Sequence, residues 1–313
     1  MQDKNSKSLF GIDINEYTQD VDFKVISTKI DFLYLRSSGS GSGRFRIDKK
    51  FFEFAKKSRE YGIPVGAYHF ALPSYDLTTA DSQCDDFIDV LQQGFGTKDY
   101  GDLFPVLDVE APTDNLMSTS ALVEWIDRFR KRFDKKTRRR LMLYTGSFFI
   151  EIYNNFNVNG TYPLKNMPLW IGMYTSIPGN PPYPKDQGGW TRWRIWQYSE
   201  NQVVQGVGNP VDANWGPNNI ELLMQPSVVK NLSAAYITNG NIRVTWSAVP
   251  DVDLLGYNIF VNGYWVGTVD EKDTEFLIKK SAIPNLNGKN ATVSIEAFDY
   301  DGEVSKTRAK VTL

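Results

Sequence analysis

Short apolar runs alternate with amphipathic segments over the first two-thirds of the chain. Eight of these runs have the length and composition of buried strands. Because the segments between the early runs follow a helical period, the pattern predicts βαβ units, a parallel sheet and a closed (β/α) barrel of the TIM type. The later connections are rich in loop residues, so we expect the barrel to be irregular there. The runs are LFGIDI (9–14), FLYLRS (32–37), PVGAYHFA (64–71), LFPVLDVE (103–110), RLMLYTG (140–146), PLWIGMY (168–174), WRIWQYS (193–199) and NPVDANW (209–215).

Two of the helical segments carry clear signals. The segment 48–62 begins at Asp48, a suitable N-cap, and ends at Gly62. The segment 118–133 places one apolar stripe at helical spacing, which predicts a helix packed against the sheet. The stripe consists of Leu122, Trp125, Ile126, Phe129 and Phe133.

The pattern changes near Pro226. Several β-type runs follow, separated by turn residues, and no helical segment intervenes. Asn262-Gly263, between two such runs, is a strong signal for a two-residue hairpin. The chain is therefore predicted to be an α/β barrel domain over residues 1–224, followed by a small all-β, immunoglobulin-like sandwich over residues 225–313.

Four acidic residues fall at the ends of predicted barrel strands: Asp13, Asp108, Glu110 and Asp212. In parallel barrels the catalytic groups lie at the C-terminal ends of the strands, so these acids would meet at one mouth. Asp108 and Glu110 form a D-x-E pair, and residues i and i+2 of a strand point to the same face. Such a pair alone is more often a solvated or capping pair. With Asp13 and Asp212 in register, the catalytic interpretation is favoured.

Two crowded, partly buried carboxyl groups repel each other, so we expect the pKa of at least one to rise. A carboxylic acid with a raised pKa can protonate a leaving oxygen near neutral pH, while its partner stays anionic and stabilises positive charge. This is the chemistry of glycoside cleavage.

Composition narrows the function classes. The formal charge is −2, so a nucleic-acid partner is not indicated. Cys84 is the single cysteine and His69 the single histidine, which indicates no metal site and no cofactor. Aromatic residues make up 14% of the chain. Both a large core and a sugar-binding groove explain this value.

The first ten residues, MQDKNSKSLF, contain no apolar segment of the kind found in signal peptides, and no later run approaches the length of a membrane span. We therefore expect synthesis in the cytoplasm and no membrane insertion.

Residues 9–223 resemble glycoside hydrolase family 25, the lysozymes of fungal and phage type. The matching motifs occur in the order typical of that family. They are GIDIN (11–15), FLYLRSSGSG (32–41), GIPVGAYHFA (62–71), PVLDVE (105–110), LYTG (143–146), LWIGMY (169–174), IWQYS (195–199) and VDANW (211–215).

The resemblance implies an irregular β/α barrel that hydrolyses the β-1,4 bond between N-acetylmuramic acid and N-acetylglucosamine in peptidoglycan. It implies that Glu110 is the general acid and that Asp108 orients the substrate's 2-acetamido group. Asp13 and Asp212 would flank the site, tune pKa values and bind sugar hydroxyls.

Further residues at strand ends are candidates for substrate binding. Tyr68, Tyr144, Trp170 and Tyr174 could line the groove or stack on sugar rings, although core packing explains each of them equally well. Gln197 could bind substrate amides.

Residues 226–313 resemble a fibronectin type III module, on the basis of Trp246 in VTWSAV, Tyr257 in LLGYNIFVNG and the ending VSIEAFDYDGEVS. The module is interpreted as a spacer, with binding to wall polysaccharide as the alternative. Tyr264 and Trp265 would be either sugar platforms or part of the sandwich core.

The leading hypothesis is a bacteriolytic muramidase, in the form of a phage or prophage endolysin or a virion-associated lysin. Such a protein would act on the bacterial cell wall after release from the cytoplasm, or as a virion component. One alternative is a chitinase-like glycosidase, which usually has a further Asp where this chain has Val106. The other is a non-catalytic wall-binding protein.

Overall fold

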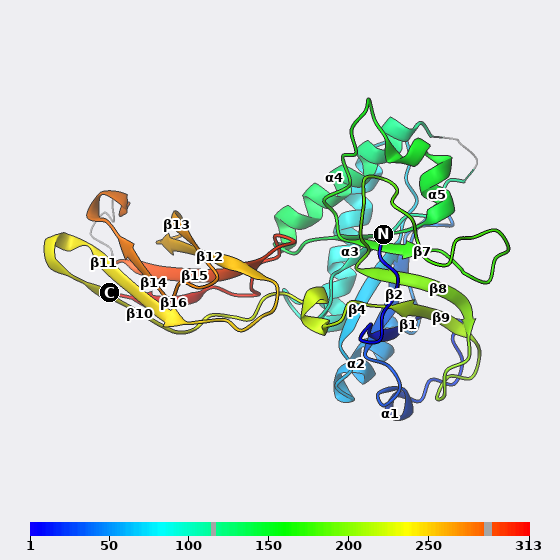
Figure 1. Cartoon of the computed structure of the whole chain (residues 1–313), viewed down its shortest axis with the longest axis horizontal. Helices are drawn as coiled ribbons and strands as arrows, with labels where there is room; N and C mark the ends of the chain where they lie inside the picture. Colours follow the sequence, from blue (N-terminus) through cyan, green and yellow to red (C-terminus); the bar gives the residue numbers. More distant parts are fainter. Residues whose placement is uncertain (114–116, 285–289) are drawn as a thin grey trace. The chain divides into compact units, whose positions relative to one another are not determined.

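The computed structural model describes residues 1–113, 117–284 and 290–313 (Figure 1). These residues divide into two compact units, Met1–Met224 and Gln225–Leu313. The first unit combines strands and helices, and the second is built from strands and short 3-10 turns. The candidate site lies in the first unit.

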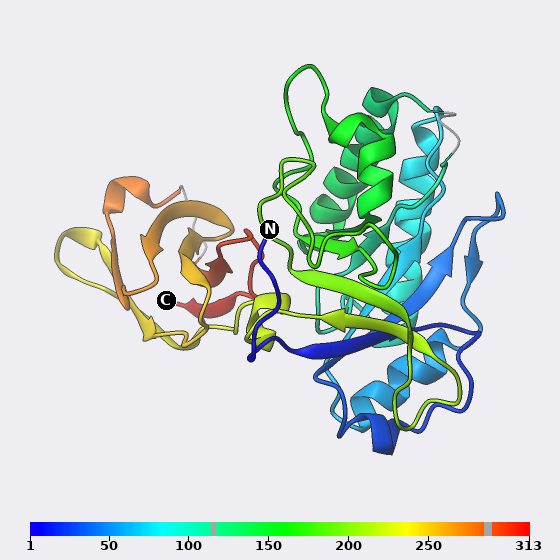
Figure 2. The ribbon, with the colours of Figure 1, turned by 45° about the vertical axis from the view of Figure 1, so that its right-hand side comes forward.

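Eight strands of the first unit close a barrel in the order β1-β9-β8-β7-β6-β5-β4-β2, and β2 then pairs with β1. Figure 2 shows the first and last strands, dark blue and yellow-green, side by side where the ring closes. The two-residue strand β3 (Arg46–Ile47) pairs with β2 outside the ring. Each of the eight predicted runs contains one barrel strand, and only β2 and β8 extend beyond the end of their run. They are β1 (Phe10–Ile14), β2 (Phe32–Gly39), β4 (Val65–Phe70), β5 (Val106–Asp108), β6 (Met142–Gly146), β7 (Leu169–Gly172), β8 (Ile195–Gln202) and β9 (Val211–Trp215).

The last strand departs from the prediction of a parallel sheet. Strand β9 runs antiparallel to both β8 and β1. Parallel strands need a crossover of roughly a dozen residues or more, and the 203–210 connection is shorter than that. As a result, the N-terminal end of β9 lies at the same mouth as the C-terminal ends of the parallel strands, and Asp212 sits at that end.

The main helices pack on the outside of the barrel. Figure 1 shows α3 and α4 side by side. In α4 the Ser118 hydroxyl accepts from the Ala121 amide, and all five residues of the predicted stripe are buried. The described residues 173–194 contain no helix, as expected for an irregular barrel. The helices are α1 (Phe23–Ile26), α2 (Phe51–Glu60), α3 (Thr78–Phe95), α4 (Thr119–Thr137) and α5 (Ser147–Ile152).

The prediction that Asp48 caps α2 is wrong. The N-cap position is Lys50, which makes no capping hydrogen bond through its side chain. Asp48 Oδ2 accepts from Arg36 Nε and from the Glu16 amide, each at 3.0 Å, while Oδ1 accepts from the Lys50 amide at 3.0 Å. The Asp48 carboxylate therefore joins the residue before α2 to the barrel mouth instead of occupying the N-cap position. Gly62, with φ +67°, follows the end of the helix as predicted.

The barrel interior is filled with side chains. Phe32, Tyr34, Phe104 and Met142 are almost fully buried there. The Tyr34 ring lies 4.7 Å from the Trp170 ring, centroid to centroid. These side chains form a packed aromatic floor beneath the mouth where the acids lie.

The second unit contains two antiparallel sheets, in the orders β10-β11-β14 and β13-β12-β15-β16. The Asn262-Gly263 hairpin joins β12 to β13, and both residues have positive φ, as a type I′ turn requires. Trp246 and Tyr257 are buried in the core between the sheets. The assignment of the second unit to the immunoglobulin-like class stays a prediction. The strands are β10 (Lys230–Tyr236), β11 (Ile242–Ser247), β12 (Leu254–Val261), β13 (Tyr264–Asp270), β14 (Glu275–Ile278), β15 (Thr292–Asp299) and β16 (Ala309–Thr312).

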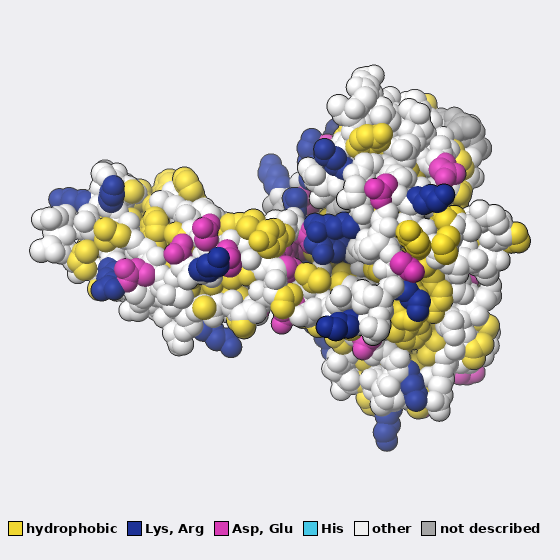
Figure 3. Space-filling model, viewed as in Figure 1, with side chains coloured by type: hydrophobic (Ala, Val, Ile, Leu, Met, Phe, Trp, Pro, Cys, Tyr) yellow, Lys and Arg dark blue, Asp and Glu magenta, His cyan; other side chains and the backbone are white. Residues whose placement is uncertain are grey.

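Acidic and basic side chains are interspersed on the visible face in Figure 3. Among the residues that the structure describes, no helix has both the length and the apolar character needed to cross a bilayer.

Candidate active site

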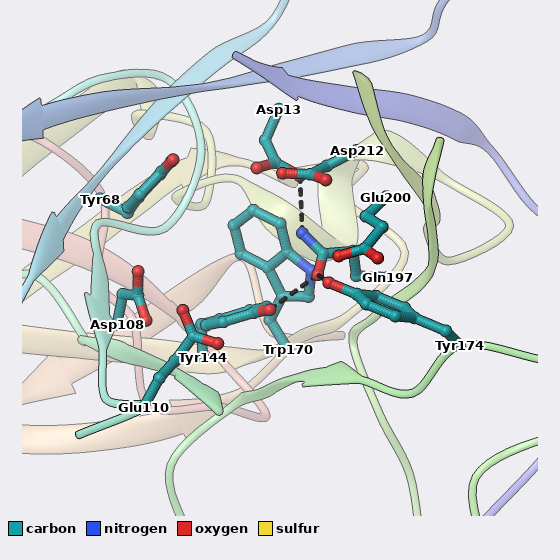
Figure 4. A pocket seen from close by; sticks show the side chains of 10 residues that line it. All are labelled: Asp13, Tyr68, Asp108, Glu110, Tyr144, Trp170, Tyr174, Gln197, Glu200 and Asp212. Atoms are coloured by element: carbon teal, nitrogen blue, oxygen red, sulfur yellow. Dashed lines mark hydrogen bonds between the residues drawn. The ribbon is translucent and has the colours of Figure 1, made fainter. Parts of the chain in front are cut away.

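A hollow of about 270 Å³ opens at the mouth of the barrel, above the aromatic floor (Figure 4). All nine catalytic and substrate-binding candidates predicted from the barrel sequence line the hollow, together with Glu200, which was not predicted. The hollow is about the size of one sugar ring, and most of its lining is polar. The lining residues are Asp13, Tyr68, Asp108, Glu110, Tyr144, Trp170, Tyr174, Gln197, Glu200 and Asp212.

Asp108 and Glu110 form one carboxyl pair. Asp108 is the last residue of β5 and is buried, and Glu110 follows two positions later on the same side. Burial raises the pKa of Asp108 well above its ordinary value, and the nearby Glu110 carboxylate raises it further. Burial also raises the pKa of Glu110. Two adjacent buried carboxylates repel each other, so the pair resists losing both of its protons.

One oxygen of this pair has no protein partner. Asp108 Oδ1 is buried without a hydrogen bond from any described residue. A buried carboxylate oxygen without a donor is costly, and such atoms are rare in folded proteins. Asp108 itself belongs to the lining of the hollow.

Asp13 and Asp212 form a second carboxyl pair on the opposite side of the hollow (Figure 4). The two residues are direct partners in the β1–β9 register. Burial and the neighbouring Asp13 carboxylate raise the pKa of Asp212 to about 9. Burial raises the pKa of Asp13 as well, although hydrogen bonds from Asn214 and Gln197 oppose the shift. Asp212 therefore keeps its proton near neutral pH.

Gln197 connects the acids to the aromatic side chains. Its Nε2 donates to Asp13 Oδ2 at 3.0 Å, and its Oε1 accepts from Tyr144 Oη at 2.7 Å and Tyr174 Oη at 3.0 Å. Asn214 makes a parallel connection, because it donates to Asp13 Oδ2 at 2.8 Å and accepts from Trp170 Nε1 at 2.8 Å. The lining is thus fixed before any ligand binds.

Comparison with known proteins identifies the family. Residues 12–207 match the model of glycosyl hydrolases family 25. This span is more than half of the chain. The chain belongs to glycosyl hydrolases family 25.

Individual relatives agree with this assignment. The chain is 57% identical to the spore cortex lytic enzyme SleM of Clostridium perfringens, with a TM-score of 0.95, over 100% of this chain and 99% of that structure. It is 30% identical to the N,O-diacetylmuramidase of Arthroderma benhamiae over 65% of this chain and 82% of that protein. It is 28% identical to Lysozyme M1 of Streptomyces globisporus over 65% of this chain and 66% of that protein. This family 25 protein is therefore a glycoside hydrolase of the lysozyme type.

Two residues of this family 25 site, Glu200 and Asn214, were not predicted from the sequence. Glu200 lines the hollow although it lies three positions after Gln197, and in a regular strand these two residues would point to opposite faces. The β8–β9 register shifts between Gln197 and Ser199 and again before Gln202, which re-aims Glu200. Asn214 was missed as a connector because it supports the lining from behind. Its position two residues after Asp212, on the same strand, was the available signal.

His69 lies outside the hollow and is buried between Ser38 Oγ, 2.9 Å from Nδ1, and Gln83 Oε1, 3.2 Å from Nε2. Burial lowers the pKa of His69 to about 4, so the ring is neutral at physiological pH. Its role in this enzyme is structural. The described residues contain no group of three or more His, Cys, Asp or Glu side chains arranged to hold a metal ion.

Replacing Gly172 with Ala is expected to lower kcat/KM by about ten- to a hundredfold, the range typical of a misplaced catalytic group. A Cβ at this position would lie 2.8 Å from Tyr144 Oη, so the hydroxyl would have to leave Gln197. Steady-state kinetics on cell-wall substrate would measure the effect. Tyr144→Phe removes the same hydrogen bond without a clash and should give a loss in the same direction. A Gly172→Ala enzyme with the wild-type rate would contradict the role of this contact.

Proposed function

We propose that the chain is an N-acetylmuramidase that hydrolyses the β-1,4 bond between N-acetylmuramic acid and N-acetylglucosamine, with Glu110 as general acid. The observation that carries the proposal is the Asp108–Glu110 pair in the lining of a sugar-sized hollow, where burial raises the pKa of both groups. In the proposed resting state this pair shares one proton. Membership of a lysozyme family supports it.

In the proposed reaction the substrate's own acetamido group is the nucleophile. Its carbonyl oxygen bonds to the anomeric carbon while the glycosidic C–O bond breaks, and Glu110 gives its proton to the departing oxygen. The resulting oxazoline-like intermediate is opened by water, whose proton returns to the Glu110 carboxylate. Two displacements at one carbon retain its configuration. Substrate-assisted reactions of this kind are a known departure from the two-carboxylate scheme.

Asp108 is proposed to accept the acetamido N–H through Oδ1, the oxygen that lacks a protein donor. This bond would favour the anionic form of Asp108 and so lower its pKa. Because the pair shares one proton, stabilising the Asp108 anion moves that proton onto Glu110, where the reaction needs it. Binding of the correct sugar would thereby prepare the acid.

Asp13 and Asp212 are proposed to bind sugar hydroxyls. In this proposal the Asp212 carboxyl group is protonated and donates a hydrogen bond, and the Asp13 carboxylate is ionised and accepts one. Gln197 would hold Asp13 in place and contact substrate amides. Trp170 supports the floor, and the hydroxyls of Tyr144 and Tyr174 are already engaged with Gln197, so the faces and edges of these rings are what a sugar would meet.

The chemical identity of the new ends tests the bond assignment. After digestion of purified peptidoglycan, borohydride reduction and acid hydrolysis, the proposal predicts the reduced alcohol of muramic acid. The reduced alcohol of glucosamine, in excess, would instead identify a glucosaminidase. Undigested wall carried through the same steps gives the background.

The biological setting is also a proposal. The 57% identity to SleM over the full chain supports spore cortex peptidoglycan as the substrate, since that protein is described as a spore cortex lytic enzyme. The endolysin setting is the second candidate. Decoated spores and vegetative walls digested side by side would separate them, and a clear preference for vegetative walls would favour the endolysin.

The role of the second unit is testable through Tyr264 and Trp265. Both are exposed, with 66% and 63% of their surface accessible, so the alternative that they belong to the sandwich core is wrong. Trp265 Nε1 donates to Thr268 Oγ1, which donates to Asn258 Oδ1, and this chain fixes the ring.

The spacer interpretation predicts that full-length Trp265→Ala enzyme co-sediments with purified walls as well as wild type does. The wall-binding interpretation predicts a loss of about five- to a hundredfold in affinity, the range for one or two stacking contacts. Tyr236→Ala, on another exposed aromatic side chain of this unit, is the matched control.

The two other hypotheses from the sequence are not retained. A non-catalytic wall-binding protein is set aside because the chain is a glycoside hydrolase by family. A chitinase-like enzyme is set aside because the family match is to lysozymes, and Val106 stands where a chitinase would carry an acid.

A further inference from the structure

A second hollow of about 550 Å³ adjoins the first one. The two hollows share Glu110, Tyr144 and Tyr174 in their linings. A substituent on a sugar held beside Glu110 could therefore extend directly into the second hollow. Its other walls come from the start of α5 and from the loop that follows β7.

The walls of this second hollow are tied together without a ligand. Ser147 Oγ and Gln187 exchange hydrogen bonds of 3.1 and 3.0 Å, which join α5 to the loop. Asn180 Nδ2 donates to the Tyr174 carbonyl oxygen at 2.8 Å. A binding surface that is organised in advance loses less entropy when it binds.

The side chains in the second hollow are of mixed chemistry. Phe148 and Ile177 are 53% and 49% exposed, which is high for apolar side chains. Lys185 and Glu151 carry opposite charges and are exposed. Among the described residues, neither forms a hydrogen bond or a salt bridge within 4.0 Å through its side chain, and they do not pair with each other. The hollow thus offers one cation, one anion and apolar surface at separate points.

A neutral sugar has no charged group that could form an ion pair with Lys185 or with Glu151. A short peptide with a carboxylate, an amino group and small apolar side chains could pair with the cation, pair with the anion and contact the apolar surface. The substrate class carries such a peptide, since the lactyl group of muramic acid bears the stem peptide of the wall.

We propose that the second hollow binds this stem peptide, with Lys185 pairing with a stem carboxylate, Glu151 with a stem amine, and Phe148 and Ile177 contacting its apolar side chains. This inference rests on the proposed muramidase function and extends it, because it makes the peptide part of what the enzyme recognises.

The test compares Lys185→Gln and Glu151→Gln with wild type on soluble glycan strands from one wall preparation. One portion keeps its stems, one has the stems removed by an amidase, and one has the stem amines acetylated. On strands with stems, each variant should raise KM about two- to fivefold, the range for an exposed ion pair, with kcat unchanged. On stem-free strands both variants should match wild type. Acetylation should raise KM for wild type but not further for Glu151→Gln.

Lys29→Gln and Glu124→Gln, exposed residues outside both hollows, serve as charge-matched controls and should behave as wild type. Equal effects of the two variants on strands with and without stems would show that the hollow holds a sugar, and would overturn the proposal. An effect of Lys185→Gln that persists on stem-free strands would assign the free lactyl carboxylate instead, and would also overturn it. If wild type cleaved none of the strands, the muramidase function itself would have failed.

Discussion

Glu110→Gln is expected to reduce the clearing of a suspension of purified walls by about 10²- to 10⁴-fold, the range attributed to a positioned general acid. The amide cannot give a proton to the leaving oxygen, and it also ends proton sharing with Asp108. Turbidity measured over time, together with quantified reducing ends, gives the rate.

The control for this substitution is Glu124→Gln, which makes the same chemical change on the exposed face of α4. It should clear walls at the wild-type rate. Wild-type activity should also form a bell against pH. It falls at low pH when both carboxyl groups of the pair are protonated, and at high pH when neither is. Clearing by Glu110→Gln at the rate of Glu124→Gln would remove Glu110 from its proposed role.

Asp108→Asn is expected to lower kcat by about 10²- to 10³-fold, the cost typical of removing one group that stabilises developing charge. A neutral amide can still accept a hydrogen bond, but it does not stabilise the positive charge that builds up on the acetamido group as it attacks. The low-pH limb of the bell should disappear as well, because no second carboxyl group is left to be protonated. Single-turnover rates across the pH range measure both effects.

A second substrate sharpens this test. Glycan strands with their acetyl groups removed lack the nucleophile, so wild type should cleave them far more slowly, and Asp108→Asn should add little to that loss. Asp89→Asn, on an exposed position of α3, is the matched control. A full additional loss in Asp108→Asn on deacetylated strands would show that Asp108 acts independently of the acetamido group.

Local sequence was sufficient for most of the elements of the barrel. Strand runs and the α4 stripe depend on the period of apolar residues, and this period is set by backbone geometry within a few residues. The N-cap assignment of Asp48 was wrong because α2 begins after Lys50, and the Asp48 carboxylate is bound by Arg36 of β2 as well as by the Lys50 amide. The predicted direction of β9 was wrong for a similar reason. This direction depends on the length of the connection between β8 and β9 and on the open edges of β8 and β1, which β9 closes.

The exposure of Tyr264 and Trp265 is a similar case in the second unit. Asn262-Gly263 predicts the hairpin from local sequence alone. Whether Tyr264 and Trp265 are buried depends instead on whether another sheet covers them. The second hollow beside the active site could not be predicted either, because its walls come from α5 and the loop after β7, whose relative position no local pattern encodes.

By itself the sequence determined which residue types were present and their spacing along each strand: the D-x-E pair, the acids at strand ends and the aromatic residues beside them. Those features follow from side-chain alternation, which is local. Only the tertiary structure decided that Asp212 meets Asp13 across an antiparallel pair, that Gln197 and Asn214 hold these acids, and that a bulge brings Glu200 into the hollow. Each of these contacts joins residues far apart along the chain or depends on strand register, and both are fixed only when the barrel closes.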